Sequence, residues 1–162
     1  MKCVVQRIHQ ESSLINNNKL AGKTNVPGLM VLLSWGKHEQ EEFENLAELH
    51  QHEKWLLDKI IGLRIFPDQE GKMNLSLEQY AEESVVYWVP QFTLYASLKS
   101  GFRPSFTKAL DPKIAQRRFE ICQSYLKSIA TNKSQQFYFG KFGADMELQF
   151  SNWGPVTLIL EK

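Results

Sequence analysis

Long hydrophobic runs and paired cysteines are both missing from this sequence. No apolar stretch approaches membrane-spanning length, and the opening residues MKCVVQRIHQ lack the continuous apolar core of a secretory signal peptide. The two cysteines, Cys3 and Cys122, cannot form a disulfide framework and belong to no Cys-x-x-Cys pair. We therefore expect buried or half-buried thiols in a protein of the reducing cytoplasm, without a membrane partner.

An excess of either charge is also missing. The 19 Lys and Arg residues against 18 Asp and Glu residues give a formal net charge of +1. A protein that coats nucleic acid over a broad surface is strongly basic, so that class is disfavoured, whereas a protein that holds only the end of an RNA is not. The composition, with 43% hydrophobic and 23% charged residues, is that of a globular protein without repeats or linkers. We expect one domain over residues 1–162.

Two residue periods divide the chain into strands and helices. Strands are predicted at KCVVQRI, GLMVLLSWG and SVVYWVPQFTLYA, and a hairpin with an Asn-rich turn at SSLINNNKLAGK. PDQEGKMNLSL predicts a loop, and QQFYFGKFGADMELQFSNWGPVTLILEK predicts two or three further strands.

Helical spacing appears in two segments. The first, EQEEFENLAELHQHEKWLLDKIIGLRIF, carries apolar residues on one helical face and ends at Gly62. Its predicted apolar face consists of Phe43, Leu46, Leu49, Leu56, Leu57 and Ile60. The second, DPKIAQRRFEICQSYLKSIAT, begins with Asp111 as its cap. The uneven order of elements predicts an α+β fold, with a mostly antiparallel, barrel-like β core and two packed amphipathic helices.

The common catalytic motifs do not occur. There is no Gly-x-Ser-x-Gly elbow, P-loop, His-Glu-x-x-His pair or dinucleotide fingerprint. His50 and His52 stand two residues apart on a predicted helix and point to different faces, so we expect no metal site and no cofactor. An enzyme with this sequence would depend on backbone amides and a few neutral side chains. That chemistry suffices for an activated substrate such as an ester.

Two stretches contain candidate residues for such a site. PQFTLYA places Gln91 and Thr93 on one side of a predicted strand and Phe92 on the other. Thr93 lacks an evident adjacent base, so a cross-strand threonine is favoured over a nucleophile. KSGFRPSF places Lys99 and Arg103 beside a glycine, which suits either a phosphate contact or a solvated basic loop.

Two prolines mark special backbone positions. Gly154 and Pro155 separate an Asn-Trp pair from the last predicted strand, which predicts a turn, and the glycine permits close backbone approach. Pro90 predicts a bend, a break or an edge position in its strand.

Taken together, these segments resemble the D-aminoacyl-tRNA deacylase family over essentially the whole chain. The matching stretches, in the family's order, are VVQR, GLMVLL, GLRIFPDQEGKMNLSL, QFTLYA, GFRPSF, FGADM and NWGPVT. The resemblance implies the family's fold and a homodimer without metal. It also implies hydrolysis of the ester that joins a D-amino acid, or glycine, to the terminal adenosine at the 3′ end of tRNA.

The resemblance assigns Gly154 and Pro155 to chiral selection. In the family this pair has a cis peptide bond and enters the active site of the other subunit, where main-chain atoms grip the substrate's amino group and refuse an L side chain. Arg7 of VVQR matches the arginine that braces the pair.

The resemblance also implies the catalytic strand and the adenine pocket. Gln91, Phe92 and Thr93 match the segment beneath the scissile ester, where backbone N–H groups face the oxyanion and the tRNA 2′-hydroxyl assists water. Phe142 and Met146 are candidates for the adenine pocket, with ordinary core packing as the alternative.

Two residues depart from the family pattern. Pro90 replaces the usual serine, and an animal-type branch that tolerates an L-amino acid has a Pro-Gln pair there. Trp153 replaces a small or acidic residue. Because Phe92, Thr93 and Arg7 are kept, the D-specific branch is favoured. An L-tolerant deacylase and a non-catalytic nucleic-acid-binding paralogue stay as alternatives. The first helix is also expected to be longer than in the family.

Overall fold

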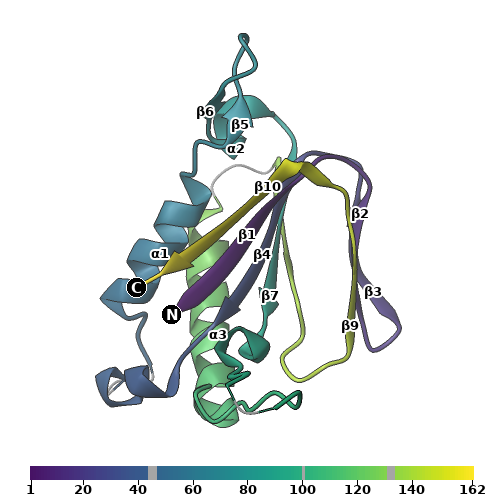
Figure 1. The fold of residues 1–162 in the computed structure, drawn as a ribbon. Helices are drawn as coiled ribbons and strands as arrows, with labels where there is room; N and C mark the ends of the chain where they lie inside the picture. The colour runs from purple at the N-terminus through teal and green to yellow at the C-terminus, as the bar shows by residue number, and fades with distance from the viewer. Residues whose placement is uncertain (44–46, 100, 131–133) are drawn as a thin grey trace.

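The computed structural model describes residues 1–43, 47–99, 101–130 and 134–162, and it centres on a five-stranded sheet in the order β10-β1-β4-β7-β8 (Figure 1). The strands are β1 (Lys2–Ile8), β4 (Gly28–Ser34), β7 (Ser84–Pro90), β8 (Gln135–Phe139) and β10 (Asn152–Glu161). β1 is antiparallel to β10 and to β4, whereas the β4–β7 and β7–β8 pairs are parallel. The sheet is therefore mixed.

Two smaller sheets complete the β structure. One has the order β3-β2-β9, from β2 (Ser12–Asn16), β3 (Lys19–Thr24) and β9 (Met146–Gln149), and the other pairs β5 (Phe66–Pro67) with β6 (Met73–Leu75). The predicted α+β class is confirmed. The described strands form open sheets and no closed barrel, so the barrel-like core is corrected to this arrangement.

The parallel pairing has a topological cause. The helices are α1 (Gln51–Ile61), α2 (Leu77–Tyr80) and α3 (Pro112–Ile129), with 3₁₀ turns η1 (Lys37–Glu42) and η2 (Phe92–Tyr95). α1 lies in the connection from β4 to β7, and α3 in the connection from β7 to β8. Long helical crossovers return the chain to the same end of the sheet, which makes the joined strands parallel. No helix of the described ranges is long and apolar enough to cross a bilayer.

The first helix begins later than the sequence predicts. His50 is its N-cap, and the carboxylate of Glu53 accepts a hydrogen bond from the His50 N–H at 2.9 Å. This capping box fixes the start at Gln51, so the acidic segment before it is a short 3₁₀ turn and not a first turn of α1. Leu46, expected on the apolar face, lies outside the described residues. That this helix is longer than the family's stays a prediction.

Several other expectations are confirmed. The Asn-rich hairpin turns at Asn17 and Asn18, which have φ of 47° and 61°, as a two-residue turn between β2 and β3 requires. β7 ends at Pro90, the residue that breaks the donor pattern. The predicted loop after α1 contains the short β5–β6 hairpin, with its turn at Gly71.

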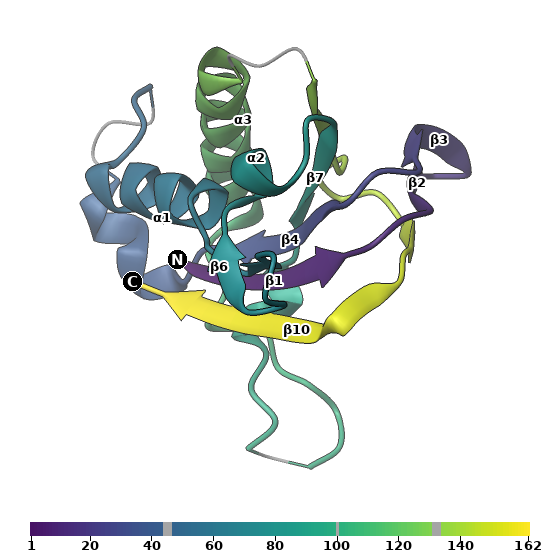
Figure 2. The same ribbon diagram turned by 90° about the horizontal axis from the view of Figure 1, so that it is seen from above.

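Two cores lie on the two faces of the central sheet. α1 and α3 cover one face (Figure 2), where Leu56, Ile60 and Phe119 of the helices pack on Val31 and Trp88 of the sheet. The other face of β7 packs under the β3-β2-β9 sheet. This second core contains Ile8, Leu14, Met30, Val85, Tyr87 and Val89. β7 is consequently buried along its whole length, and Cys3 and Cys122 are buried in the first core as expected.

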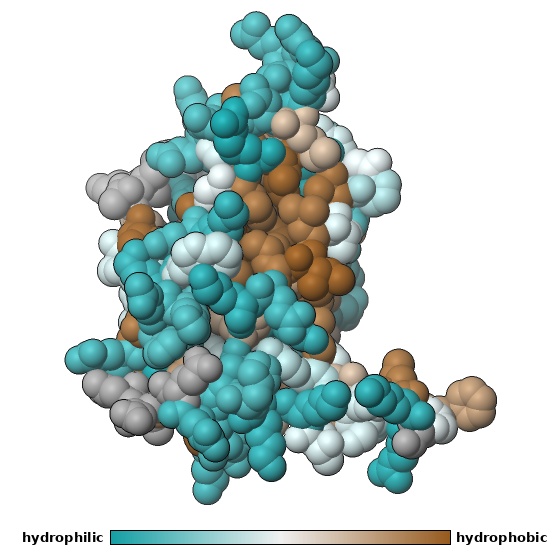
Figure 3. All heavy atoms as spheres, turned by 60° about the vertical axis from the view of Figure 1, so that its left-hand side comes forward, coloured by the Kyte–Doolittle hydropathy of each residue, from teal (hydrophilic) through white to brown (hydrophobic). Residues whose placement is uncertain are grey.

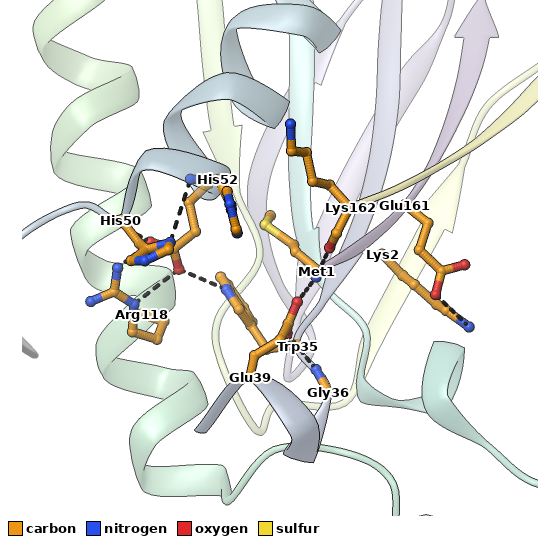
Figure 4. Close-up of polar contacts among 11 residues, drawn as sticks. Met1, Lys2, Trp35, Gly36, Glu39, His50, His52, Arg118, Glu161 and Lys162 are labelled. Atoms are coloured by element: carbon orange, nitrogen blue, oxygen red, sulfur yellow. Dashed lines mark hydrogen bonds and ion pairs between the residues drawn. The ribbon is translucent and has the colours of Figure 1, made fainter. Parts of the chain in front are cut away.

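A buried ion pair joins the two long helices. Glu53 of α1 and Arg118 of α3 are 1% and 0% exposed, and the Arg118 Nε donates to Glu53 Oε1 at 2.9 Å while Nη2 contacts Oε2. The same carboxylate accepts from the Trp35 indole N–H at 2.7 Å and caps α1 at His50. Figure 4 shows Arg118, Trp35 and His50 converging from three elements. The paired charges and their hydrogen bonds satisfy each other inside the core.

We predict that Arg118→Met lowers the free energy of unfolding by about 3–5 kcal/mol, because it leaves the Glu53 carboxylate buried without a cation. The matched control is Arg117→Met, whose exposed pair with Glu120 is 3.4 Å long and should contribute less than about 1 kcal/mol. Urea unfolding of both variants measures the difference. Equal losses in the two variants would contradict the account of the pair.

Candidate active site

A cavity of about 910 Å³ opens at one end of the central sheet. The carboxyl ends of the parallel strands β4 and β7 lie side by side there, which is where open α/β sheets usually bind ligands. The segment before α3 and the loop after β8 close the other sides. The lining residues are Leu33, Ser34, Trp35, Lys37, Gln40, Pro90, Gln91, Phe92, Phe106, Thr107, Ala109, Leu110, Asp111, Pro112, Ile114, Ala115, Phe142, Gly143, Ala144, Asp145 and Met146.

The segment Gln91–Thr93 reaches this cavity, but not as a strand. Gln91 and Phe92 line it, whereas Thr93 does not. The expected alternation of side chains along a strand is wrong, because the chain turns into η2 directly after Pro90. The Gln91 N–H continues the sheet by donating to the Leu33 carbonyl at 2.8 Å.

The turn leaves two backbone donors without helical acceptors. Phe92 and Thr93 are the first residues of η2, and the first N–H groups of a helix have no partner within it. The Thr93 hydroxyl accepts a hydrogen bond from the Gln91 side-chain amide, so its described contact is an amide and not a base. Phe92, 54% exposed, packs edge-on against Phe106 with ring centroids 5.0 Å apart.

Phe142 and Met146 both line the cavity, and Met146 lies near Pro90 at the end of β7. Gly140 allows this approach: a Cβ there would lie 2.8 Å from Met146 Sδ and 3.0 Å from Pro90 Cδ. The loop between β8 and β9 is held by the Asn-rich turn, because Asn17 Oδ1 accepts from the Asp145 N–H at 3.0 Å. The turn between β2 and β3 thus positions the loop that forms one wall of the cavity.

Lys99 and Arg103 are not brought to the cavity. They lie in an exposed loop that is closed at its base by two hydrogen bonds between Ser97 and Ser105, of 2.8 and 3.0 Å. The charged side chains that do line the cavity are Lys37, Asp111 and Asp145, and the sequence reasoning missed all three. For Lys37, the usable signal was its place just beyond the carboxyl end of a buried strand.

Gly154 and Pro155 lie at the start of β10, are exposed, and are joined by a cis peptide bond. Arg7, 7% exposed, donates from Nε to the Trp153 carbonyl at 3.1 Å and from Nη1 to the Ile65 carbonyl at 2.5 Å. Its guanidinium lies 4.2 Å from the centroid of the Trp153 ring. Burial lowers the pKa of Arg7 from its ordinary value, and its Nε and Nη1 each donate to a carbonyl group.

The register of the sheet separates this motif from the cavity. Arg7 pairs with Leu29 near the start of β4, whereas Pro90 pairs with Leu33 near its end. Four residues of strand correspond to about 13 Å. Gly154 and Pro155 therefore lie at the opposite end of the sheet from the cavity in the same chain (Figure 1).

The described residues contain no cluster of side chains that could bind a metal ion. No group of three or more His, Cys, Asp and Glu side chains gathers there as a metal site would require. The His50 and His52 rings contact each other edge-on at 4.9 Å on the helical side of the molecule.

The fold is shared with known structures. A solved structure named "c-Myc DNA Unwinding Element Binding Protein" has a TM-score of 0.77 and 29% sequence identity, covering 100% of this chain and 99% of that one. A second, described as a probable eukaryotic D-amino acid tRNA deacylase, shares the fold with a TM-score of 0.65 at 18% identity, covering 99% of each chain. The fold and the cavity thus define an α+β protein of this structural class.

The sequence comparison gives the family. Residues 4–161 match the D-Tyr-tRNA(Tyr) deacylase family, and the chain belongs to it, as the sequence motifs predicted. Relatives named D-aminoacyl-tRNA deacylase include those of Desulfatibacillum aliphaticivorans, 40% identical over 99% of both chains, and of Desulfovibrio desulfuricans, 36% identical over 99% of this chain and 96% of that one. The relative from Protochlamydia amoebophila is 38% identical over 99% of this chain and 95% of its own.

We predict that Gly154→Ala destabilises the protein by about 1–3 kcal/mol, since residue 154 has φ of +120° and a Cβ there would lie 2.9 Å from Arg7 Nη2. Gly143→Ala is the control: its φ is +71°, and nothing lies within 4 Å of its added Cβ. It should cost about 1 kcal/mol from backbone conformation alone. Thermal unfolding compares the two, and a Gly154 variant no less stable than the control would contradict the close contact with Arg7.

Proposed function

We propose that this chain hydrolyses the ester between a D-amino acid and the terminal adenosine of tRNA, releasing the free amino acid and tRNA. The observation that carries the proposal is one cavity in which two separate family motifs meet. Gln91 and Phe92 of QFTLYA and Phe142 and Met146 of FGADM line it together, although about fifty residues separate them in sequence. Membership of the deacylase family supports the reaction class.

The chemistry is that of an activated ester with backbone assistance. The adenine packs on Phe142 and Met146, whose ring and sulfur suit a flat base. Water attacks the ester carbonyl, and negative charge develops on its oxygen. The N–H group of Phe92, which lines the cavity and lacks a helical acceptor, stabilises this charge. The carbon–oxygen bond to the ribose then breaks, and the ribose oxygen takes the proton that the water loses. The neighbouring 2′-hydroxyl of the tRNA assists that proton transfer.

Chiral selection requires a second copy of the chain. Gly154 and Pro155 are exposed and lie at the far end of the sheet, so the partner's pair and not the chain's own enters the cavity. Main-chain atoms at that place would collide with an L side chain and clear a D side chain. Glycine has no side chain to refuse, so glycine mischarged on alanine tRNA is a further substrate.

The outer surface supports such a homodimer. β10 is an edge strand of the central sheet and carries Ile159 with 75% of its surface exposed. Val4 and Leu32, on the sheet face that the long helices do not cover, are only half-buried. Figure 3 shows apolar side chains gathered in a continuous area on one face of the molecule. Uncovered apolar surface of this kind is typical of subunit contacts. We place the dimer in the cytoplasm, where its tRNA substrate and its two free thiols are compatible.

The two departures from the family pattern do not close the cavity. Pro90 lines it beside a volume of about 910 Å³, and Trp153 packs on Arg7 at the other end of the sheet. An open cavity favours the enzyme over a non-catalytic nucleic-acid-binding paralogue, although one structural neighbour is named as a DNA-binding protein. Because Pro90 borders the site, the same experiment also has to test whether the protein accepts an L-amino acid.

The test is a deacylation time course with tRNA charged separately with D-tyrosine, L-tyrosine, glycine and L-alanine. We expect release of D-tyrosine and glycine, with both L-amino acids spared. Ala144→Trp, which fills the cavity from its lining, should lose at least about tenfold in rate because the adenosine no longer fits. Release of L-alanine would support the L-tolerant alternative, and no release from any substrate would refute the enzyme.

A further inference from the structure

A second hollow, of about 510 Å³, adjoins the candidate active-site cavity and is lined by Lys2, Lys37, His38, Tyr95, Thr107 and Lys108. Lys37 and Thr107 line both spaces, so the hollow and the cavity lie next to each other. The lysines come from three distant parts of the chain. Backbone contacts hold them there: the Lys37 N–H donates to the Lys108 carbonyl at 2.8 Å, and Gly36 forms a bridge with Ala109.

The charge balance of this hollow is positive. Three lysines and no carboxylate line it, and among the described residues Lys2 pairs with Glu161, whose Oε1 lies 3.4 Å from Lys2 Nζ (Figure 4). Lys2 Nζ also lies 4.9 Å from the centroid of the Tyr95 ring. Lys37 and Lys108 have no ion-pair partner among the residues whose positions are described. Two cations are therefore available to an anion.

Tyr95 lines the hollow and carries a polar group without a described partner. Its side chain is 6% exposed, and its hydroxyl is one of two buried side-chain polar atoms without a hydrogen-bond partner in the described structure. A buried hydroxyl normally has a partner, because leaving it unpaired costs about 1–3 kcal/mol. Burial, assisted by the Glu161 charge, raises the pKa of Tyr95 to about 12. The group is therefore a hydrogen-bond donor at neutral pH.

We propose that this hollow binds a backbone phosphate of the tRNA acceptor strand. It is the phosphate that links the terminal adenosine to the preceding nucleotide. The proposal rests on the proposed function, because the adjoining cavity would hold that adenosine. Lysine ammonium groups and a hydroxyl donor are what a phosphodiester oxygen accepts from. A site of this kind also explains how a chain with a net charge of +1 grips an RNA end without a broad basic surface.

The test is equilibrium binding of two probes that carry no amino acid, the RNA trinucleotide CCA and free adenosine, which has no phosphate. In the double variant Lys37→Gln/Lys108→Gln we expect about tenfold weaker binding of CCA and a clearly smaller loss for adenosine, because Lys37 also lines the adenosine cavity whereas Lys108 does not. The slope of log K against log salt should also become shallower by about 0.7 for each phosphate that the variant no longer neutralises. Tyr95→Phe should weaken CCA binding in the same direction without affecting adenosine.

The matched control is Lys19→Gln/Lys23→Gln, which makes the same change of charge on β3, away from the hollow. Wild-type affinity of the Lys37/Lys108 variant for CCA would overturn the proposal. So would an equal loss for adenosine, or an equal loss in the control variant. None of these measurements requires hydrolysis. If the protein releases no D-amino acid but the lysine variant still binds CCA more weakly, the proposed activity fails and the phosphate site stands. If it hydrolyses the ester but the lysine variant binds CCA normally, the activity stands and the phosphate site fails.

Discussion

The buried pair between Glu53 and Arg118 is the contact on which the rest of the architecture depends. One carboxylate caps α1, accepts the Trp35 indole and holds α3, so three elements share a single charged centre. Trp35 and the first turn of α3 are walls of the candidate active-site cavity. Desolvating two charges is costly, and the geometry offsets that cost only when every partner is in place. The pair therefore fixes where α3 begins relative to the end of β4, and with it the shape of the site.

The proposed function places the chemistry and its chiral selectivity at opposite ends of one sheet. The cavity forms where two parallel strands end, and the exposed Gly154–Pro155 pair lies beside the other end of β4. Main-chain groups dominate both ends. At one end are the N–H groups without helical acceptors at the start of η2, and at the other is Gly154, which the Arg7 side chain approaches closely. This division explains why the sequence contains no catalytic motif of the usual kinds. Under the proposed function, a single subunit is incomplete, and a symmetric partner would bring the two ends together.

Sequence reasoning recovered what depends on local pattern. β1, β4, the Asn-rich hairpin and α3 follow from residue period and turn chemistry, and four predicted residues meet in the cavity. The errors have tertiary causes. The start of α1 is set by the Glu53 carboxylate and its partner on α3, and the parallel order of the sheet by helical crossovers. Lys37 and Lys108 meet through a backbone contact between distant segments, while Lys99 and Arg103, adjacent to a suggestive glycine, lie in an exposed loop.

The central claim, that each active site is completed by the other subunit, is tested most directly by mixed dimers. Gly154→Ala subunits keep the cavity and damage the Gly154–Pro155 pair, here called the selector. Ala144→Trp subunits keep the selector and block the cavity. After unfolding together and refolding at equal amounts, the account predicts D-selective hydrolysis at about a quarter of the wild-type level, since half of the dimers are mixed and each has one intact composite site. If the selector acted within its own chain, mixing would restore no D-selective hydrolysis, and that result would contradict the account.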